Sequence, residues 1–242
     1  MKLNLYIILL LFLSFVAKAD QILELIKIPN LSLHTLEDKK SLAFLKPTKD
    51  FFVGSSSENI SCKKNQSQNF NEKYLKTQRS FDKYNDDFFR KIKLKYIVLC
   101  SELEIAGIPA LGFANPKTKT LILNINSNNL YFERVLHHEV FHVIEYNFSK
   151  YFSNISWSNL NLKEFKYAEC STCTKKLGLN TLDSTDGFFS EYSKSTSSED
   201  MAEVFSHIMI GANLKNVDPI LKKKINFIRK NLLKIDPNFR YD

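Results

Sequence analysis

The sequence of 242 residues has no internal repeat and no long low-complexity segment. Repeat architectures are therefore excluded, and a content of 44% hydrophobic and 25% charged residues is typical of a globular protein. Beyond the first residues, no stretch is apolar over the roughly 20 residues that a membrane span requires. A chain of this length suits one domain, or one domain with a small accessory region.

The only long apolar run lies at the start of the chain. Residues 3–16 follow Lys2, and Ala17 and Ala19 occupy the two positions that a signal-peptide cleavage site requires. No Cys near this site is available to carry a lipid. We expect residues 1–19 to be a cleaved signal peptide, with an uncleaved anchor as the alternative. The mature protein would then be exported, to the periplasm or the medium, without stable membrane insertion.

Basic residues outnumber acidic ones, with 34 Lys and Arg against 26 Asp and Glu and a formal charge of +8. Cleavage after Ala19 would remove two lysines and no acid, which leaves 32 against 26, or +6. A basic balance can favour nucleic acids or anionic surfaces. Apart from a cluster at 222–224, the lysines are scattered, and no stripe pairs them with aromatic residues. We therefore expect a solvated surface, no nucleic-acid partner and a monomer.

The four cysteines are Cys62, Cys100, Cys170 and Cys173. An even number in an exported protein predicts disulfides, and the sequence does not choose among the three possible pairings. Free thiols, a structural zinc site with four cysteines, and a redox C-x-x-C at 170–173 are the alternatives, in that order. The redox alternative comes last because no thioredoxin-like strand and helix flank the motif.

The apolar pattern predicts a domain that combines helices and strands. Residues 76–92 have helical spacing, whereas 95–99 and 120–125 are typical of buried strands. Between these two strands, residues 108–112 are rich in turn formers.

The segment before this region has a different composition. Residues 54–73 are rich in Ser, Asn, Gln and Lys, which is typical of a loop or linker. We therefore divide the mature chain into an N-terminal accessory region with its linker, residues 20–75, and a main domain, residues 76–242.

Three of the five histidines lie within six residues, in the sequence His137-His138-Glu139-Val-Phe-His142. On a helix, His138 and His142 lie one above the other, so both imidazoles can reach one metal ion. Glu139, the next residue, can take a proton from a metal-bound water, so this H-E-x-x-H pattern indicates zinc-dependent hydrolysis. The alternative is a helix whose histidines serve only packing.

The surrounding residues predict a helix from about 129 to 146 that is buried on most sides, with Ser127 as its N-cap. His137 is rotated by about 100° from His138 on such a helix, so we expect it to serve packing and not to bind the metal.

A catalytic zinc usually has three protein ligands. No H-x-x-G-x-x-H sequence follows His142, which excludes a third histidine ligand of the metzincin kind. A second predicted helix, residues 196–211, carries Glu199 and Glu203 on one face. One of them can bind the metal while the other accepts a hydrogen bond from a ligating imidazole. The alternative is that acidic residues at a helix start only favour the helix dipole.

Other residues of this second helix have simpler interpretations. Ser197 is the expected N-cap, with Asp200 three residues later as in a capping box, and Gly211 is the expected end. The helix-dipole interpretation fits Asp200 better than Glu203. We expect His207 to lie on the helix surface.

Several motifs in order resemble a known family. Residues 187–205 are similar to the third-ligand region of gluzincins of the anthrax lethal factor type, and more similar still to a group of bacterial zinc-binding metallopeptidases. In that group an H-H-E-x-x-H helix precedes W-x-x-L-N, G-F-x-S-x-Y and E-D-x-A-E segments. Here these segments are residues 137–142, 157–161, 187–192 and 199–203. The resemblance covers about residues 80–210.

This resemblance implies a role for each matching residue. Glu199 is implied to be the third zinc ligand, and Glu203 the carboxylate that holds a ligating imidazole. Tyr192 is implied to donate a hydrogen bond to the oxyanion or the leaving amine, with a core aromatic as the alternative. The accessory domains of the toxin are absent, and the first 60 residues have no counterpart, so substrate choice does not carry over.

We therefore expect an α+β, zincin-like domain in which a small sheet packs on the active-site helix. Its C-terminal helical part includes an amphipathic helix, residues 218–235, whose lysines form a solvated face. The predicted function is that of a zinc metalloendopeptidase with one catalytic zinc ion, acting on a peptide or protein. A catalytically silent binding protein of the same fold at the cell envelope, and a basic exported protein that binds cell-surface polymers, are the alternatives.

Overall fold

The computed structural model describes residues 30–36, 40–54, 59–64, 67–172, 178–182, 185–214 and 217–241. The predicted signal peptide and Cys173 lie outside these residues. The larger of two sheets has five strands in the order β1 (Leu31–Leu36), β2 (Ala43–Pro47), β5 (Tyr96–Cys100), β9 (Thr120–Asn124) and β8 (Gly112–Asn115). The three central strands β2, β5 and β9 are parallel, and both outer strands are antiparallel to their neighbours.

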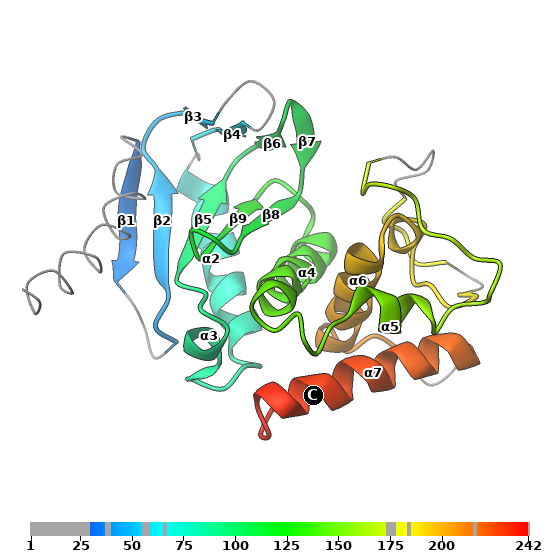
Figure 1. Cartoon of the computed structure of the whole chain (residues 1–242). Helices are drawn as coiled ribbons and strands as arrows, with labels where there is room; N and C mark the ends of the chain where they lie inside the picture. The colour runs from blue at the N-terminus through cyan, green and yellow to red at the C-terminus, as the bar shows by residue number, and fades with distance from the viewer. Residues whose placement is uncertain are drawn as a thin grey trace, which may run out of the picture.

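A smaller antiparallel sheet covers one face of the larger one. Its order is β3 (Phe51–Val53), β4 (Ile60–Cys62), β6 (Leu103–Ile105) and β7 (Ile108–Ala110). Six α-helices complete the described fold: α2 (Ser67–Phe81), α3 (Phe88–Lys91), α4 (Asn129–Asn147), α5 (Asn154–Ser158), α6 (Ser197–Met209) and α7 (Pro219–Ile235). Figure 1 shows α4 between the larger sheet and α6, with α7 running beneath both helices.

Strand β5 is apolar along its whole length because both of its faces are covered. Successive side chains of a strand point to opposite faces. Ile97 and Leu99 accordingly join the core that includes the helices, whereas Tyr96 and Val98 join the core beneath the smaller sheet. A buried parallel strand therefore has a continuous apolar run instead of an alternating pattern.

Helix α4 is buried on most sides because it lies between the sheet and α6. Leu136, Val140 and Phe141 are fully buried in the helical core. The N-cap is Asn128, whose side chain accepts a hydrogen bond from the Tyr131 backbone at 2.9 Å. The prediction that Ser127 is the cap was wrong by one residue, because its hydroxyl donates back to the Asn124 carbonyl at 3.1 Å.

The structure confirms the α+β, zincin-like fold, but it corrects several local predictions. The predicted helix 76–92 is two helices, α2 and α3, separated by a turn. The turn-rich stretch 108–112 contains β7 and the first residue of β8, because Gly and Pro are tolerated in short strands at a sheet edge. The predicted linker 54–73 contains β4 and the start of α2.

The boundary predicted after residue 75 lies inside α2, and the strands on either side of it share hydrogen bonds. Ala43 to Leu45 of β2 pair with Tyr96 to Val98 of β5, so the accessory region contributes two strands to the larger sheet. None of the helices in the described part of the chain combines the length and apolar character of a membrane span.

Helix α7 begins where it was predicted, since Asp218 caps the backbone N–H groups of Ile220 and Leu221. The prediction that its lysines are all solvated was wrong for Lys224, which is 0% exposed. Its ammonium group contacts Asp200 of α6 at 2.6 Å and donates to the Gly187 carbonyl at 2.7 Å.

Asp200 lies in the first turn of α6, as the helix-dipole interpretation requires, but it is also fully buried. The carboxylate accepts hydrogen bonds from the Trp157 indole at 2.8 Å and the Tyr167 hydroxyl at 2.5 Å, besides its contact with Lys224. Helices α5, α6 and α7 therefore all contact the buried carboxylate of Asp200. The helical pattern of the sequence does not predict this tertiary contact.

A disulfide joins the two sheets. Cys62 of β4 and Cys100 of β5 are bonded, with a sequence separation of 38 residues. Cys170 is also disulfide-bonded. The predicted disulfides are confirmed for these residues, and the alternative of a zinc site with four cysteine ligands is excluded because no thiolate of Cys62 or Cys100 is left to bind a metal.

Replacement of both Cys62 and Cys100 by Ala should lower the free energy of unfolding by about 2–4 kcal/mol. The reason is that a closed loop of this length restricts the unfolded chain, which loses about 4 kcal/mol of loop entropy in the simplest model. Urea unfolding of the oxidised proteins at equal zinc concentration measures the difference. Because Cys170 keeps its own disulfide, the comparison isolates the one bond, and equal midpoints would contradict the prediction.

Candidate metal centre

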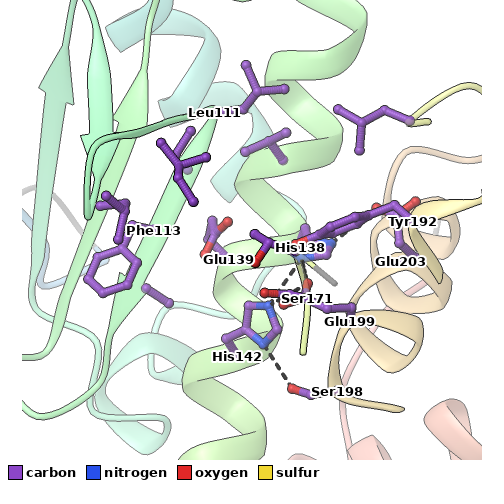
Figure 2. A pocket seen from close by; sticks show the side chains of 18 of the residues that line it. Leu111, Phe113, His138, Glu139, His142, Ser171, Tyr192, Ser198, Glu199 and Glu203 are labelled. Carbon is purple, nitrogen blue, oxygen red and sulfur yellow. Dashed lines mark hydrogen bonds and ion pairs between the residues drawn. The ribbon is translucent and has the colours of Figure 1, made fainter. Parts of the chain in front are cut away.

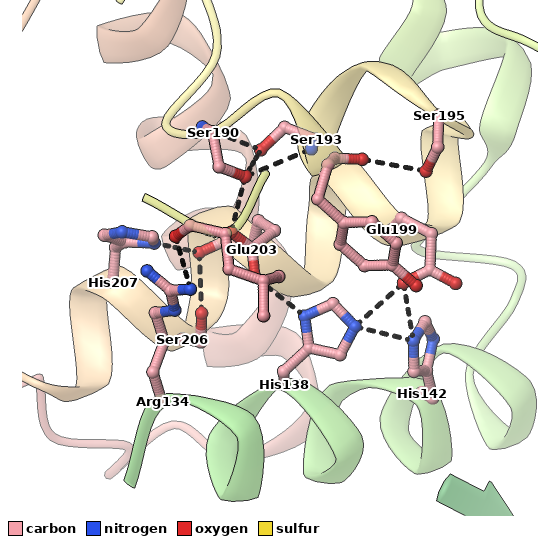
Figure 3. A network of polar contacts seen from close by, with 12 residues as sticks. Arg134, His138, His142, Ser190, Ser193, Ser195, Glu199, Glu203, Ser206 and His207 are labelled. Carbon is pink, nitrogen blue, oxygen red and sulfur yellow. Dashed lines mark hydrogen bonds and ion pairs between the residues drawn. The ribbon is translucent and has the colours of Figure 1, made fainter. Parts of the chain in front are cut away.

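Three predicted ligands converge between α4 and α6. The ligand atoms of His138, His142 and Glu199 all lie within 4.8 Å of one another. His138 Nε2 is 2.8 Å from Glu199 Oε2, and His142 Nε2 is 3.3 Å from the same oxygen. The two Nε2 atoms are 3.1 Å apart. Figure 3 shows both imidazoles rising from α4 toward the carboxylate.

These distances fit a single tetrahedral zinc ion. With bonds of about 2.0–2.1 Å, two ligand atoms of such an ion are about 3.3 Å apart. The three separations of 2.8, 3.1 and 3.3 Å are close to this value. Two imidazole nitrogens and one carboxylate oxygen are also the donor set of a catalytic zinc site with one open position. The side chains therefore suit zinc in both chemistry and spacing.

A second carboxylate holds the ring of His138. Glu203 Oε1 is 3.2 Å from His138 Nδ1, and Glu203 Oε2 accepts a hydrogen bond from the Ser190 hydroxyl at 2.8 Å. The contact occupies Nδ1 and leaves Nε2 directed at the ligand cluster, so it selects one orientation of the ring. Glu203 lies one helical turn after Glu199, as the spacing predicts.

The ring of His142 is held from the other side of the site. Its Nδ1 atom is 3.3 Å from the Ser198 hydroxyl, which also donates to Glu145. Glu145 lies on α4, three residues after His142. Neither Ser198 nor Glu145 belongs to a sequence motif that predicts a role at this site. The H-E-x-x-H spacing contains no information on which groups approach the second nitrogen of each ring.

Glu139 points away from α6, toward the edge strand β8. Its side chain is 7% exposed and receives a hydrogen bond from the Ala114 backbone. A Cβ atom at Gly112 would lie 2.6 Å from Glu139 Cγ and 2.7 Å from Val135 Cγ1. Only glycine therefore lets β8 approach α4 this closely, and the close approach confines the Glu139 carboxylate beside the ligand cluster.

Tyr192 precedes α6 in the short 3-10 helix η1 (Tyr192–Lys194). Its ring lies 5.9 Å from the His138 ring, and its phenol is hydrogen-bonded to Glu199. Burial, followed by the charges of Glu199 and Glu139, raises the pKa of the phenol far above its usual value. Tyr192 is therefore a permanent hydrogen-bond donor at the edge of the cluster.

One cavity of about 690 Å³ is lined by the three candidate ligands together with Glu139, Tyr192 and Glu203. Figure 2 shows Glu139, His138 and Tyr192 facing it, with Leu111 and Phe113 on the opposite wall. The wall formed by β7 and β8 is mostly apolar, so the polar groups are concentrated at the ligand cluster. A concave site with apolar walls and a few convergent polar groups is typical of ligand-binding cavities.

The carboxylates control the charge of the cluster. Burial opposes charge on His138, but its hydrogen bonds with Glu199 and Glu203 outweigh this effect and raise its pKa to about 9. The pKa of Glu203 is lowered to about 2, because its hydrogen bond and charge interaction with His138 outweigh burial. Burial raises the pKa of Glu139 above its usual value, since this carboxyl lacks such a close cationic partner. The pKa values of Glu139 and Glu203 are thus shifted in opposite directions within one site.

Two further histidines lie outside the cluster. His137 is fully buried, and its Nδ1 atom is hydrogen-bonded to the Tyr84 hydroxyl at 2.6 Å. Burial, with the nearby Lys83, lowers its pKa to about 3, so the ring is neutral. The prediction for His207 was wrong, because this ring is 2% exposed and stacks on Phe189 at 4.1 Å. The cap of α6 is Thr196 and not the predicted Ser197.

Residues 83–232 match the model of a family described as "Putative zinc-binding metallo-peptidase". This match covers more than half of the chain. The chain belongs to this family. The matched region runs from the turn before α3 through most of α7, so it includes the whole ligand cluster, whereas β1 to β4 and all of α2 precede it.

The comparison with solved structures identified a protein from Bacteroides caccae, described as a "putative zinc-binding metallo-peptidase". The two chains share 17% identity over 69% of each, with a TM-score of 0.42. No curated protein matches the chain. The chain thus combines membership of a zinc-binding metallopeptidase family with a candidate metal site formed by His138, His142 and Glu199.

Replacement of Glu203 by Gln should weaken zinc binding by about 10- to 100-fold while one zinc per chain can still be loaded. The reason is that a neutral amide holds the His138 ring less strongly and lowers its basicity. Competition with a chromogenic chelator measures the affinity. Glu164→Gln, at an exposed position, is the control, and an affinity equal to that of the wild type would show that the contact with His138 does not support the site.

Proposed function

We propose that this protein is an exported zinc metalloendopeptidase that hydrolyses peptide bonds of a peptide or protein. The observation that carries the proposal is that one cavity contains both a carboxylate placed to bind the metal and a second carboxylate placed beside it. Glu199 lies with the two imidazoles, whereas Glu139 lies next to them and, among the described residues, forms no hydrogen bond with either ring. A site that only binds zinc has no need of this additional buried carboxylate.

His138, His142 and Glu199 would hold the ion, and zinc supplies a Lewis acid that polarises a water and the scissile carbonyl. The other roles belong to the chain. Glu139 takes a proton from the attacking water while the bond from oxygen to the carbonyl carbon forms. The carboxyl then delivers this proton to the amide nitrogen as the bond between carbon and nitrogen breaks. A raised pKa suits a group that must both accept and return a proton near neutral pH.

Tyr192 has the properties of a donor to the developing oxyanion. Its phenol is protonated, it borders the same cavity as Glu139, and it lies beside Glu199. A hydrogen bond that strengthens as charge develops on the carbonyl oxygen lowers the barrier without tightening the binding of the substrate. The hydrogen bond from Tyr192 to Glu199 also restricts the ring before substrate binds.

Export is supported by the signal-peptide pattern of residues 1–19 and by disulfides, which persist in oxidising compartments. The apolar wall formed by β7 and β8 supports apolar side chains at the positions of the bound peptide that face this wall. The ligand set supports zinc, because two imidazoles and one carboxylate in tetrahedral spacing are preferred by this ion.

Replacement of Glu139 by Gln should leave one zinc per chain and reduce kcat by roughly 10²- to 10⁴-fold, because the amide cannot take the proton of the water. Metal analysis of purified residues 20–242 and cleavage of a quenched fluorescent peptide library measure the two quantities. His142→Ala, which should lose both zinc and activity, is the matched variant. Full activity of Glu139→Gln would reject the mechanism. Zinc without any cleavage by the wild type would favour a binding protein of this fold.

Replacement of Tyr192 by Phe should lower kcat on the order of 10²- to 10³-fold with little change in KM or zinc content, because one donor to the oxyanion is removed. Steady-state kinetics on a peptide selected from the same library provide the measurement. Tyr146→Phe changes a tyrosine that is 55% exposed at the end of α4 and is the control. A change in KM alone would mean that Tyr192 binds the ground state and not the oxyanion.

A further inference from the structure

Arg134 carries a buried charge that the fold does not neutralise by contact. It lies on α4, one helical turn before His138, and is 5% exposed. A guanidinium stays protonated at any pH at which proteins are stable. A buried charge without a partner is strongly unfavourable, so its surroundings indicate what the side chain is for.

The contacts of Arg134 leave much of its hydrogen-bonding capacity unused. Nη2 donates to the Leu179 carbonyl at 2.6 Å, and the guanidinium lies 5.1 Å from the centre of the Tyr131 ring. The Nε atom is buried and has no hydrogen-bond partner. Within the described ranges, no acidic side chain forms an ion pair with Arg134. Most buried polar groups are satisfied, so this one requires an explanation.

The position of Arg134 places it in the catalytic cavity. The side chain lines the same 690 Å³ cavity as His138, Glu139 and Glu199, and no other Lys or Arg is among the described residues that line it. Figure 3 shows it on the Glu203 side of His138, away from His142. One helical turn rises about 5.4 Å, the length of one to two residues of an extended peptide.

The neighbouring side chains define what could approach this cation. Val135 and Leu179, with Leu111 from the opposite wall, offer apolar contacts to a substrate chain. The three glutamates of the cavity would repel an anion that entered without a cation to bind it. A guanidinium presents parallel N–H donors that match the two oxygens of a carboxylate.

We propose that Arg134 binds a carboxylate of the substrate, one or two residues from the bond that is cleaved. The carboxylate is either the C-terminus of a peptide or the side chain of an internal Asp or Glu. The inference rests on the proposed peptidase function and adds a substrate class to it. It would make the cavity selective for acidic peptides although its walls are apolar.

A purely structural role for Arg134 predicts different behaviour. The charge of Arg134 contributes to the low pKa of Glu203, so it could serve only to balance that carboxylate. In that case, removal of the charge would weaken zinc binding and affect all peptides equally. A role in recognition instead predicts a loss confined to peptides that carry the carboxylate.

Binding of two peptide pairs to the zinc-loaded Glu139→Gln protein, measured by calorimetry, separates these roles without turnover. The first pair is acetyl-Ala-Leu-Phe as its free acid and as its amide. The second is acetyl-Ala-Leu-Glu-Ala-amide and the same peptide with Gln in place of Glu. Each pair is also measured with the Glu139→Gln protein that carries, in addition, either Arg134→Met or Arg134→Lys. The control carries Lys150→Met instead, which removes one exposed charge beyond the other end of α4.

At least one acid should bind on the order of 10- to 100-fold more tightly than its neutral partner, since a hydrogen-bonded ion pair is lost in the latter. This preference should disappear in Arg134→Met, decrease in Arg134→Lys and persist in Lys150→Met. The pair that shows it distinguishes a terminal from an internal carboxylate.

Equal binding within both pairs, no binding of either acid, or a preference that persists in Arg134→Met would overturn the inference. If Arg134→Met does not fold, an unchanged preference in Arg134→Lys would overturn it too. Acid-selective binding together with no cleavage of either acid by the unmodified protein would reject the peptidase function and leave the role of Arg134 standing.

Discussion

The geometry of the metal centre depends on the buried charge pair between Asp200 and Lys224. Both side chains are 0% exposed, and Trp157 and Tyr167 donate to the same carboxylate. Such a pair contributes little net stability, because the cost of removing two charges from water offsets their attraction. It does restrict how the start of α6 can pack, since any other arrangement would leave a charge unpaired. Glu199, the adjacent residue, is thereby directed at α4.

Helix α4 presents the two histidine ligands on one face and Glu139 on another. His138 and His142, four residues apart, point at α6, whereas Glu139 is rotated by about 100° and points at β8. The ligands and the proton acceptor therefore share one rigid backbone but belong to different walls of the cavity. This explains why burial raises the pKa of Glu139 while the carboxylates of α6 stay ionised beside the imidazoles.

The sequence predicts the parts of this site that depend on local spacing. The H-E-x-x-H helix follows from the helical repeat, and the motifs near Glu199 could be recognised from the order of short segments. The roles of Lys224 and Arg134 could not be predicted, because periodicity shows which side chains share a helix face but not which element packs against it. Strand β7 was missed for a related reason, since its pairing partner β6 and not its composition determines its conformation.

The contact at Gly112 has a consequence for how this cavity could vary. The backbone of β8 stands so near α4 that even one added carbon would lie 2.6 Å from the side chain of Glu139. Substrate range therefore cannot be broadened by exchanging this residue for a larger one. An engineer who wished to reshape the cleft would have to alter the outer positions of β7, such as Ile108, which is 48% exposed. The position of the edge strand β8 therefore fixes the width of the cleft beside Glu139, and the shape of the cleft can vary only at its outer edge.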